Sequence, residues 1–227
     1  MLHFAGGNCY SFVFLRKYLE SHFELCPLEL PGRGKRMTEP LLKSKPDAIN
    51  DLFQQIKSLR KATTSYVVYG HSMGASLGLY IAERLEKTGD LALALVVTGN
   101  AGPGISKQKN RYLLPEEEFK TALKQLGGMP YEVVENEELY QFFEPILRAD
   151  FEIVEKDNDL KAPVLNTSIL ALMGSNEENA GHIDNWKNYT HSSFKGRLLE
   201  GDHFFIHQHS EELANYILKA YDRSLVL

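Results

Sequence analysis

The sequence predicts an α/β fold in which helices cover both faces of a mostly parallel central sheet. Apolar, β-branched runs alternate with segments of helical spacing along the chain, which is typical of parallel strands joined by helices. The chain has 227 residues, of which 43% are hydrophobic, and this is enough to bury one full core. We therefore expect residues 1–227 to form a single domain.

The expected elements follow from the apolar spacing. In one helical segment, Ile49, Leu52 and Phe53 recur on one face. The chain begins about where a first strand should be half complete, so either that strand is very short or a few residues precede Met1. Strands are expected at residues 23–30, 65–69, 91–98, 167–173 and 197–199, and helices at residues 47–59, 73–85 and 211–221.

The segment from about residue 107 to residue 160 interrupts this alternation. It is rich in charge and has two helical patterns, at 115–126 and 137–147, separated by a Gly-Gly-Met-Pro stretch. Long loops without secondary structure are uncommon inside compact domains. We therefore predict that about 107–160 is a helical lid inserted into the domain.

Composition and charge exclude several classes of protein. A net charge of −5 is unlike that of a general nucleic-acid binder, which carries a basic face. No apolar run approaches the roughly 20 residues that a membrane helix needs, and residues 1–7 do not resemble a signal peptide. Two cysteines, Cys9 and Cys26, are too few for a disulfide framework. We expect a cytoplasmic monomer that does not act at a membrane.

A G-x-S-x-G motif carries the strongest chemical signal. Gly70-His71-Ser72-Met73-Gly74 follows an apolar strand and opens a helix. A strand-to-helix turn this sharp strains the serine backbone and requires small neighbours, and it lifts the hydroxyl above the sheet. The helix N-terminus favours negative charge that develops there. Ser72 is the predicted nucleophile.

A serine hydroxyl needs a base, which in this type of fold follows the last strand. Gly201-Asp202-His203 lies there, directly before the final helix, so His203 is the predicted base. The other histidines have no such context: His207 and His209 are expected on the surface of the last helix's first turn, and His22 and His191 in turns.

The acid of the expected triad is less well defined by the sequence. It should follow the strand at 167–173, where the turn reads Gly174-Ser175-Asn176-Glu177-Glu178. Glu177 occupies the position where an aspartate is usual, and a glutamate can also orient and stabilise the histidine. Glu178 and Asp184 remain alternatives.

An oxyanion hole needs two backbone N–H groups. Met73, the residue after the nucleophile, is expected to provide one, and Ala5, in the glycine-rich loop Phe4-Ala5-Gly6-Gly7-Asn8, the other. Such a loop could also indicate a nucleotide-binding fold, but the G-x-G-x-x-G spacing is absent.

Together these motifs resemble the type II thioesterases, which are stand-alone members of the α/β-hydrolase superfamily. The resemblance covers essentially the whole chain, and the Leu-Pro-Gly-Arg-Gly stretch is more specific than G-x-S-x-G alone. The stretches that carry it are His3-Phe4-Ala5-Gly6-Gly7, Leu30-Pro31-Gly32-Arg33-Gly34-Lys35-Arg36, Gly70-His71-Ser72-Met73-Gly74, Leu126-Gly127-Gly128-Met129-Pro130, Leu147-Arg148-Ala149-Asp150-Phe151 and Gly201-Asp202-His203-Phe204-Phe205.

The resemblance implies hydrolysis of acyl or aminoacyl thioesters on the phosphopantetheine arm of carrier proteins, so that misprimed or stalled nonribosomal peptide or polyketide synthases restart. Medium-chain fatty acyl relatives also exist. It implies no metal and no cofactor of the enzyme's own, and it departs from this chain at Glu177, where the family usually has aspartate. The alternatives are a carboxylester hydrolase for small free esters and a non-catalytic binding protein that has lost its acid.

Two further sets of residues are candidates for substrate and partner contacts. Met129, Phe142 and Phe143 of the expected lid could line an acyl channel, or could simply pack the lid onto the core. Carrier proteins are generally acidic, so basic residues could form a docking face, although solvated surface charges are common. The basic candidates are Lys35, Arg36, Lys107, Lys109 and Arg111.

Overall fold

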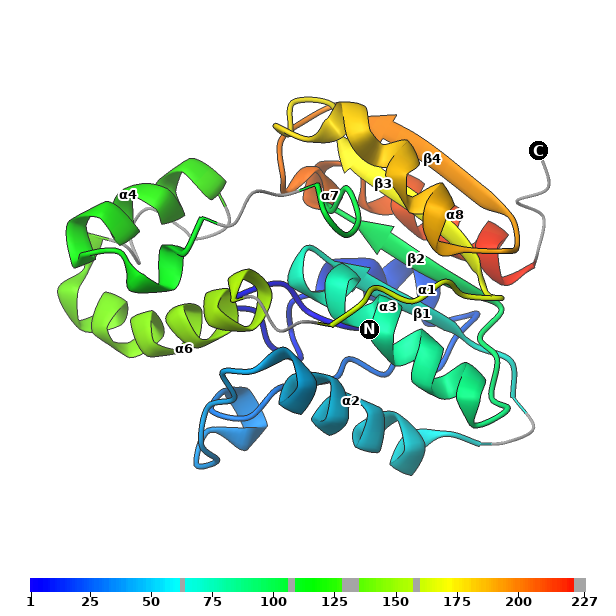
Figure 1. The fold of residues 1–227 in the computed structure, drawn as a ribbon, viewed down its shortest axis with the longest axis horizontal. Helices are drawn as coiled ribbons and strands as arrows, with labels where there is room; N and C mark the ends of the chain where they lie inside the picture. The colour runs from blue at the N-terminus through cyan, green and yellow to red at the C-terminus, as the bar shows by residue number, and fades with distance from the viewer. Residues whose placement is uncertain (62–63, 106–108, 128–134, 157–159, 223–227) are drawn as a thin grey trace.

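The central sheet has four parallel strands in the order β1-β2-β3-β4. The computed structural model describes residues 1–61, 64–105, 109–127, 135–156 and 160–222. The strands are β1 (Val67–His71), β2 (Ala94–Thr98), β3 (Ser168–Gly174) and β4 (Phe194–Leu199). Each begins within three residues of its expected position, and the predicted parallel sheet is confirmed (Figure 1).

Helices cover both faces of this sheet, as the sequence predicts (Figure 1). One face packs against α2 (Lys45–Leu59) and α3 (Met73–Lys87), and the other against α1 (Arg16–Leu19), α7 (Phe205–Gln208) and α8 (Ser210–Tyr221). The short 3-10 helices are η1 (Val13–Leu15), η2 (Gly34–Arg36), η3 (Arg111–Leu113) and η4 (Ala180–Tyr189). None of the described helices is long and apolar enough to span a bilayer.

The prediction of a strand at residues 23–30 is wrong. This segment forms no ladder and has no regular secondary structure. Its backbone exchanges two hydrogen bonds with Met1, from the Met1 amino group to Cys26 O and from Leu28 N–H to Met1 O, both 2.9 Å. Pro27 has no N–H to donate. The first strand is reduced to Leu2, which forms an isolated parallel bridge with Gly70.

Two helices, α4 (Glu116–Leu126) and α6 (Glu137–Glu155), stand to one side of the sheet (Figure 1). They share a small core of their own made by Phe119, Leu123, Tyr140, Leu147 and Phe151. The sequence predicted that the second helix ends at residue 147, but α6 continues to Glu155, because its apolar face extends through Phe151 and Ile153.

Candidate active site

Ser72 lies on a strained turn between β1 and α3. Its φ of 54° is in the region that non-glycine residues rarely adopt. The turn leaves no room for side chains on either side: a Cβ on Gly70 would lie 2.3 Å from Gly74 O, and a Cβ on Gly74 would lie 2.1 Å from Leu2 O. The G-x-S-x-G spacing is therefore required by backbone packing.

Backbone hydrogen bonds fix Ser72 beside the end of β2. Its N–H donates to Thr98 O at 2.8 Å, and the Asn100 side-chain amide donates to Ser72 O at 3.2 Å. Thr98 Oγ1 also lies 2.9 Å from Nδ1 of His71, the residue before the serine. The serine is thus held by contacts that do not involve its own hydroxyl.

His203 lies next to this turn. Its ring centroid is 4.9 Å from that of His71, and a Cβ on Gly99 would lie 3.1 Å from its Cε1 atom. The loop that carries it packs tightly on the end of β3, where a Cβ on Gly174 would lie 2.2 Å from Asp202 O. The ends of three strands therefore bring Ser72 and His203 to the same edge of the sheet.

Glu177 makes a hydrogen bond with His203. Glu177 Oε2 lies 2.6 Å from His203 Nδ1, and the two side chains are 8% and 20% exposed. Glu177 Oε1 accepts from the Gly174 N–H at 2.8 Å, so the side chain folds back on its own turn. Both carboxylate oxygens are used, which fixes a side chain one methylene longer than the aspartate expected at this position.

The two alternative acids lie elsewhere. Glu178 is exposed and pairs with Lys109 at 2.8 Å. Asp184 belongs to η4 and faces Gly196 of β4, where a Cβ would lie 3.2 Å from Asp184 Oδ1. Of the three carboxylates that the sequence left open, Glu177 is the one that contacts His203.

Ala5 and Met73, the predicted oxyanion donors, lie on two segments that meet beside the Ser72 turn. Met73 is the first residue of α3, and Ala5 lies in the loop after the Leu2 bridge. Among the described residues, no oxygen accepts a hydrogen bond from either N–H. Gly74, one residue after Met73, touches the backbone of Leu2 and His3, which brings the two segments together.

His71 is a site residue that the sequence did not single out. It is fully buried, and its Nε2 has no partner among the described residues. Burial lowers the pKa of His71 well below its ordinary value, and the neighbouring His203 lowers it further. A neutral ring therefore packs beside the ring of His203.

The channel candidates are only partly described. Phe142 is 50% exposed, whereas Phe143 packs against the core shared by α4 and α6, as Ala5 does. The rings of Phe142 and Phe143 meet edge to face, with their centroids 5.1 Å apart. Met129 lies outside the described residues, so the predicted acyl channel stays a prediction.

The basic docking candidates are mostly paired within the chain. Arg36 binds Glu39 and Asp51, Lys109 binds Glu178, and Arg111 binds Glu155. Lys107 lies outside the described residues. These intramolecular pairs give the basic residues a structural role, and the docking face remains a prediction.

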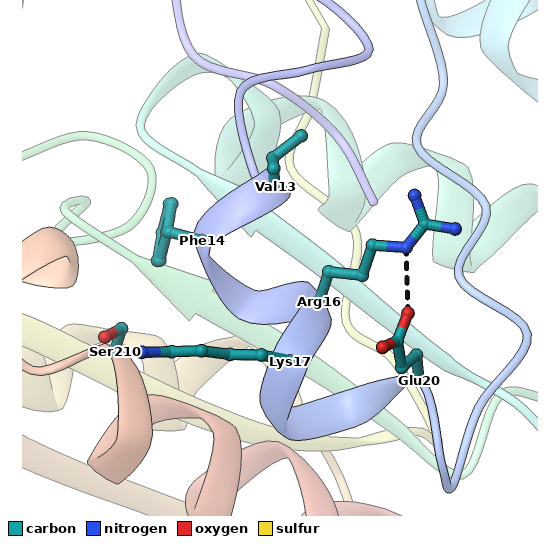
Figure 2. A pocket seen from close by; sticks show the side chains of 6 residues that line it. All are labelled: Val13, Phe14, Arg16, Lys17, Glu20 and Ser210. Carbon is teal, nitrogen blue, oxygen red and sulfur yellow. Dashed lines mark hydrogen bonds and ion pairs between the residues drawn. The ribbon is translucent and has the colours of Figure 1, made fainter.

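A surface depression of about 430 Å³ lies between η1, α1 and the start of α8 (Figure 2). Figure 2 shows the Arg16–Glu20 ion pair on its wall. Ser72, His203 and Glu177 do not line it, so it is not part of the candidate active site.

Comparisons with known proteins identify the family of the chain. The thioesterase domain family model matches residues 1–221. The chain is 31% identical to the linear gramicidin dehydrogenase LgrE of Brevibacillus parabrevis, over 93% of this chain and 82% of that protein. That name specifies a dehydrogenase, whereas the family model specifies a thioesterase.

Solved structures show the same fold over nearly the whole chain. ClbQ from the colibactin NRPS/PKS pathway superposes with a TM-score of 0.89 and is 27% identical, covering 98% of this chain and 95% of ClbQ. The type II thioesterase BorB from the borrelidin biosynthetic cluster has a TM-score of 0.87 and is 26% identical, covering 97% of this chain and 90% of BorB.

Proposed function

The chain belongs to the thioesterase family, and from this premise we propose that it releases acyl or aminoacyl groups from the phosphopantetheine arm of carrier proteins. Its relatives include proteins of nonribosomal peptide and polyketide pathways. The proposed role is that of a stand-alone editing enzyme, which clears misprimed or stalled groups so that a synthase restarts. One observation carries the catalytic part of the proposal: a strained serine follows His71, whose ring packs beside a histidine that hydrogen-bonds to a carboxylate.

In the proposed acylation step, Ser72 Oγ attacks the thioester carbonyl while His203 takes the hydroxyl proton. The new C–O bond gives a tetrahedral intermediate, whose oxyanion accepts hydrogen bonds from the Ala5 and Met73 N–H groups. The C–S bond then breaks, and the pantetheine sulfur leaves with the proton from His203. Glu177 orients the imidazole and stabilises its positive charge.

Deacylation repeats these steps with water. His203 takes a proton from water, the resulting hydroxide attacks the ester carbonyl of acyl-Ser72, and Ser72 regains its proton as the carboxylic acid leaves. A thiol is a good leaving group, so this chemistry is less demanding than amide cleavage. It requires no metal and no redox cofactor.

The remaining features of the proposal concern access and context. Helices α4 and α6 would gate entry of the acyl chain as a lid on a single domain, with Phe143 in contact with that chain. We also propose a cytoplasmic monomer, and the low cysteine content fits a reducing compartment. Size-exclusion chromatography with light scattering at several protein concentrations tests the oligomeric state.

The experiment that tests this function measures hydrolysis of a panel of acylated carrier proteins by intact mass, beside hydrolysis of a nitrophenyl ester of the same acyl group. The proposal predicts a higher kcat/KM for the carrier. The result that contradicts it is efficient cleavage of the free ester with no release from any carrier, which would identify a carboxylester hydrolase. The non-catalytic alternative rested on the missing aspartate, and the Glu177–His203 contact removes that reason.

A further inference from the structure

A buried ion pair joins α6 to the loop that follows Leu30. Arg33 Nη1 donates to Asp150 Oδ2 at 2.6 Å, and Arg33 Nη2 donates to Asp150 Oδ1 at 2.8 Å. Asp150 is 0% exposed and Arg33 is 3% exposed. Buried pairs of this kind contribute little net stability, because the desolvation of both charges offsets their attraction. The pair therefore calls for an explanation other than stability.

The same pair holds the backbone of the proposed oxyanion loop. Asp150 Oδ2 also accepts from the Gly6 N–H at 2.7 Å, across 144 residues of sequence, and Arg33 Nη1 approaches Gly7 O at 3.4 Å. Leu147, one turn before Asp150 on α6, closes the other side, since a Cβ on Gly6 would lie 2.6 Å from its Cδ2 atom. Helix α6 thus touches this loop through a charge and an apolar side chain.

The Asp150 contact, together with contacts of Gly7 and His3 within the loop, fixes both peptide planes that flank Ala5. The Gly6 N–H belongs to the plane between Ala5 and Gly6, which Asp150 holds. Phe4 O belongs to the plane that also contains the Ala5 N–H, and it accepts from the Gly7 N–H at 2.9 Å and lies 2.8 Å from His3 Nδ1. With both planes held, the Ala5 N–H has one direction, because peptide units are planar and only φ and ψ can rotate.

We propose that Asp150 is a positioning residue for the oxyanion hole, held in place by the two hydrogen bonds from Arg33. The inference rests on the proposed function, because the Ala5 N–H has this task only if Ser72 attacks an acyl carbonyl and an oxyanion forms beside the loop. Asp150 acts through the Gly6 peptide and does not touch substrate. The lid helix α6 and the Leu-Pro-Gly-Arg-Gly segment thereby set the geometry in which the transition state is stabilised.

The test compares two double variants. Arg33→Met/Asp150→Leu removes both charges and the acceptor for Gly6, and such apolar replacements of buried pairs are often neutral for stability. Arg33→Gln/Asp150→Asn also removes the charges but keeps an amide oxygen at position 150. The expected kcat of the first variant falls roughly 10- to 100-fold with KM nearly unchanged, as for a misplaced oxyanion donor. The second recovers most of that loss.

A matched control asks whether loss of any similar ion pair has this effect. Arg60 and Asp90 form a bidentate pair at 2.7 and 2.8 Å that is only partly buried. Arg60→Met/Asp90→Leu should leave kcat within about twofold of wild type, since the pair contacts neither the loop nor the proposed triad.

Inhibitor binding separates positioning from general structural damage. A trifluoromethyl ketone analogue of acyl-pantetheine forms a tetrahedral adduct with an oxyanion, whereas a thioether analogue does not. In Arg33→Met/Asp150→Leu, affinity for the ketone should fall in proportion to kcat, while affinity for the thioether is retained. Equal losses for both analogues, or wild-type kcat and ketone affinity, would overturn the inference.

Failure of the proposed function has a different signature: the wild-type protein would hydrolyse no acyl-carrier at all. If Arg33→Met/Asp150→Leu does not fold, the Gly6 amide can be replaced by an ester. A synthetic segment 1–8 is ligated at Cys9 to residues 9–227, and Asp150 and Arg33 stay intact. The inference then predicts a loss of kcat of about tenfold or more, and an unchanged kcat overturns it.

Discussion

The Ser72 turn and the rest of the candidate site are held in place by different means. Around Ser72 the constraints are backbone contacts, with Gly70 against Gly74 and Gly74 against Leu2. Around Ala5 and His203 side chains add to the backbone contacts, with Asp150 on the Gly6 N–H and Glu177 on the imidazole. A turn held by close backbone contacts has no room for an added side-chain atom. A group held by a side-chain hydrogen bond loses that contact when one polar group is removed. The two kinds of support should therefore fail differently.

The largest effect on activity is expected from His203→Ala. This substitution removes the proposed base, which Glu177 holds in place. The kcat for acyl-carrier hydrolysis should fall by about 10⁴-fold or more while the fold is retained. Steady-state kinetics with an acylated carrier, together with circular dichroism, measures both. A modest loss of kcat would mean that another group takes the serine proton.

The second-largest effect on activity is expected from a substitution of the Glu177 carboxylate. Glu177→Gln keeps the length of the side chain but removes its charge, and kcat should fall roughly 10²- to 10⁴-fold. Glu178→Gln is the matched control, because Glu178 is exposed and pairs with Lys109; its kcat should stay within about twofold of wild type. A larger loss from Glu178→Gln than from Glu177→Gln would reverse the assignment of the acid.

Gly74→Ala tests the close backbone packing of the Ser72 turn. The added Cβ would lie 2.1 Å from Leu2 O, so the turn or the start of the chain must move. The free energy of unfolding should fall by about 3 kcal/mol or more. Gly181→Ala, where a Cβ meets nothing within 4 Å, should change it by less than about 0.5 kcal/mol in urea titrations. Equal effects at the two positions would remove the case for a packed turn.

The smallest expected effect concerns His71. Burial lowers its pKa in the folded state, so below its ordinary value of 6.5 the unfolded chain binds a proton that the folded chain does not. The free energy of unfolding therefore decreases as pH falls below 6.5, by up to about 1.4 kcal/mol per pH unit from this residue. His71→Gln should make that slope shallower.

Urea unfolding at several pH values between about 4.5 and 8 checks this expectation. Thr98→Val is the matched control, because it removes the partner of His71 Nδ1 but keeps the titrating ring. It should lower stability at every pH and retain most of the slope. An unchanged slope in His71→Gln would show that His71 is not protonated preferentially in the unfolded chain.

The parts of the site that are local in sequence could be predicted from it. Strand, serine turn and helix follow one another within residues 67–87, and every close contact at Gly70 involves the turn itself or the start of α3. His203 was predictable because the last strand and last helix bracket it. The order of strands and helices along the chain thus predicts the positions of both Ser72 and His203.

The parts held by distant side chains could not be predicted in the same way. The contact between Asp150 and Gly6 spans 144 residues, and that between Arg33 and Asp150 spans 117. One signal was present: Asp150 is a lone acidic residue on the apolar face of α6, between Ala149 and Phe151. The strand expected at residues 23–30 failed for a related reason, since a ladder depends on a partner strand that this segment lacks.

Ser72→Ala tests the central claim most directly. An acylated carrier protein is incubated with wild-type enzyme or with Ser72→Ala, and the carrier is followed by intact mass. We expect the wild type to release the acyl group and the variant to lose about 10⁴-fold or more of that rate while keeping its fold. Release by Ser72→Ala at the wild-type rate would contradict the account.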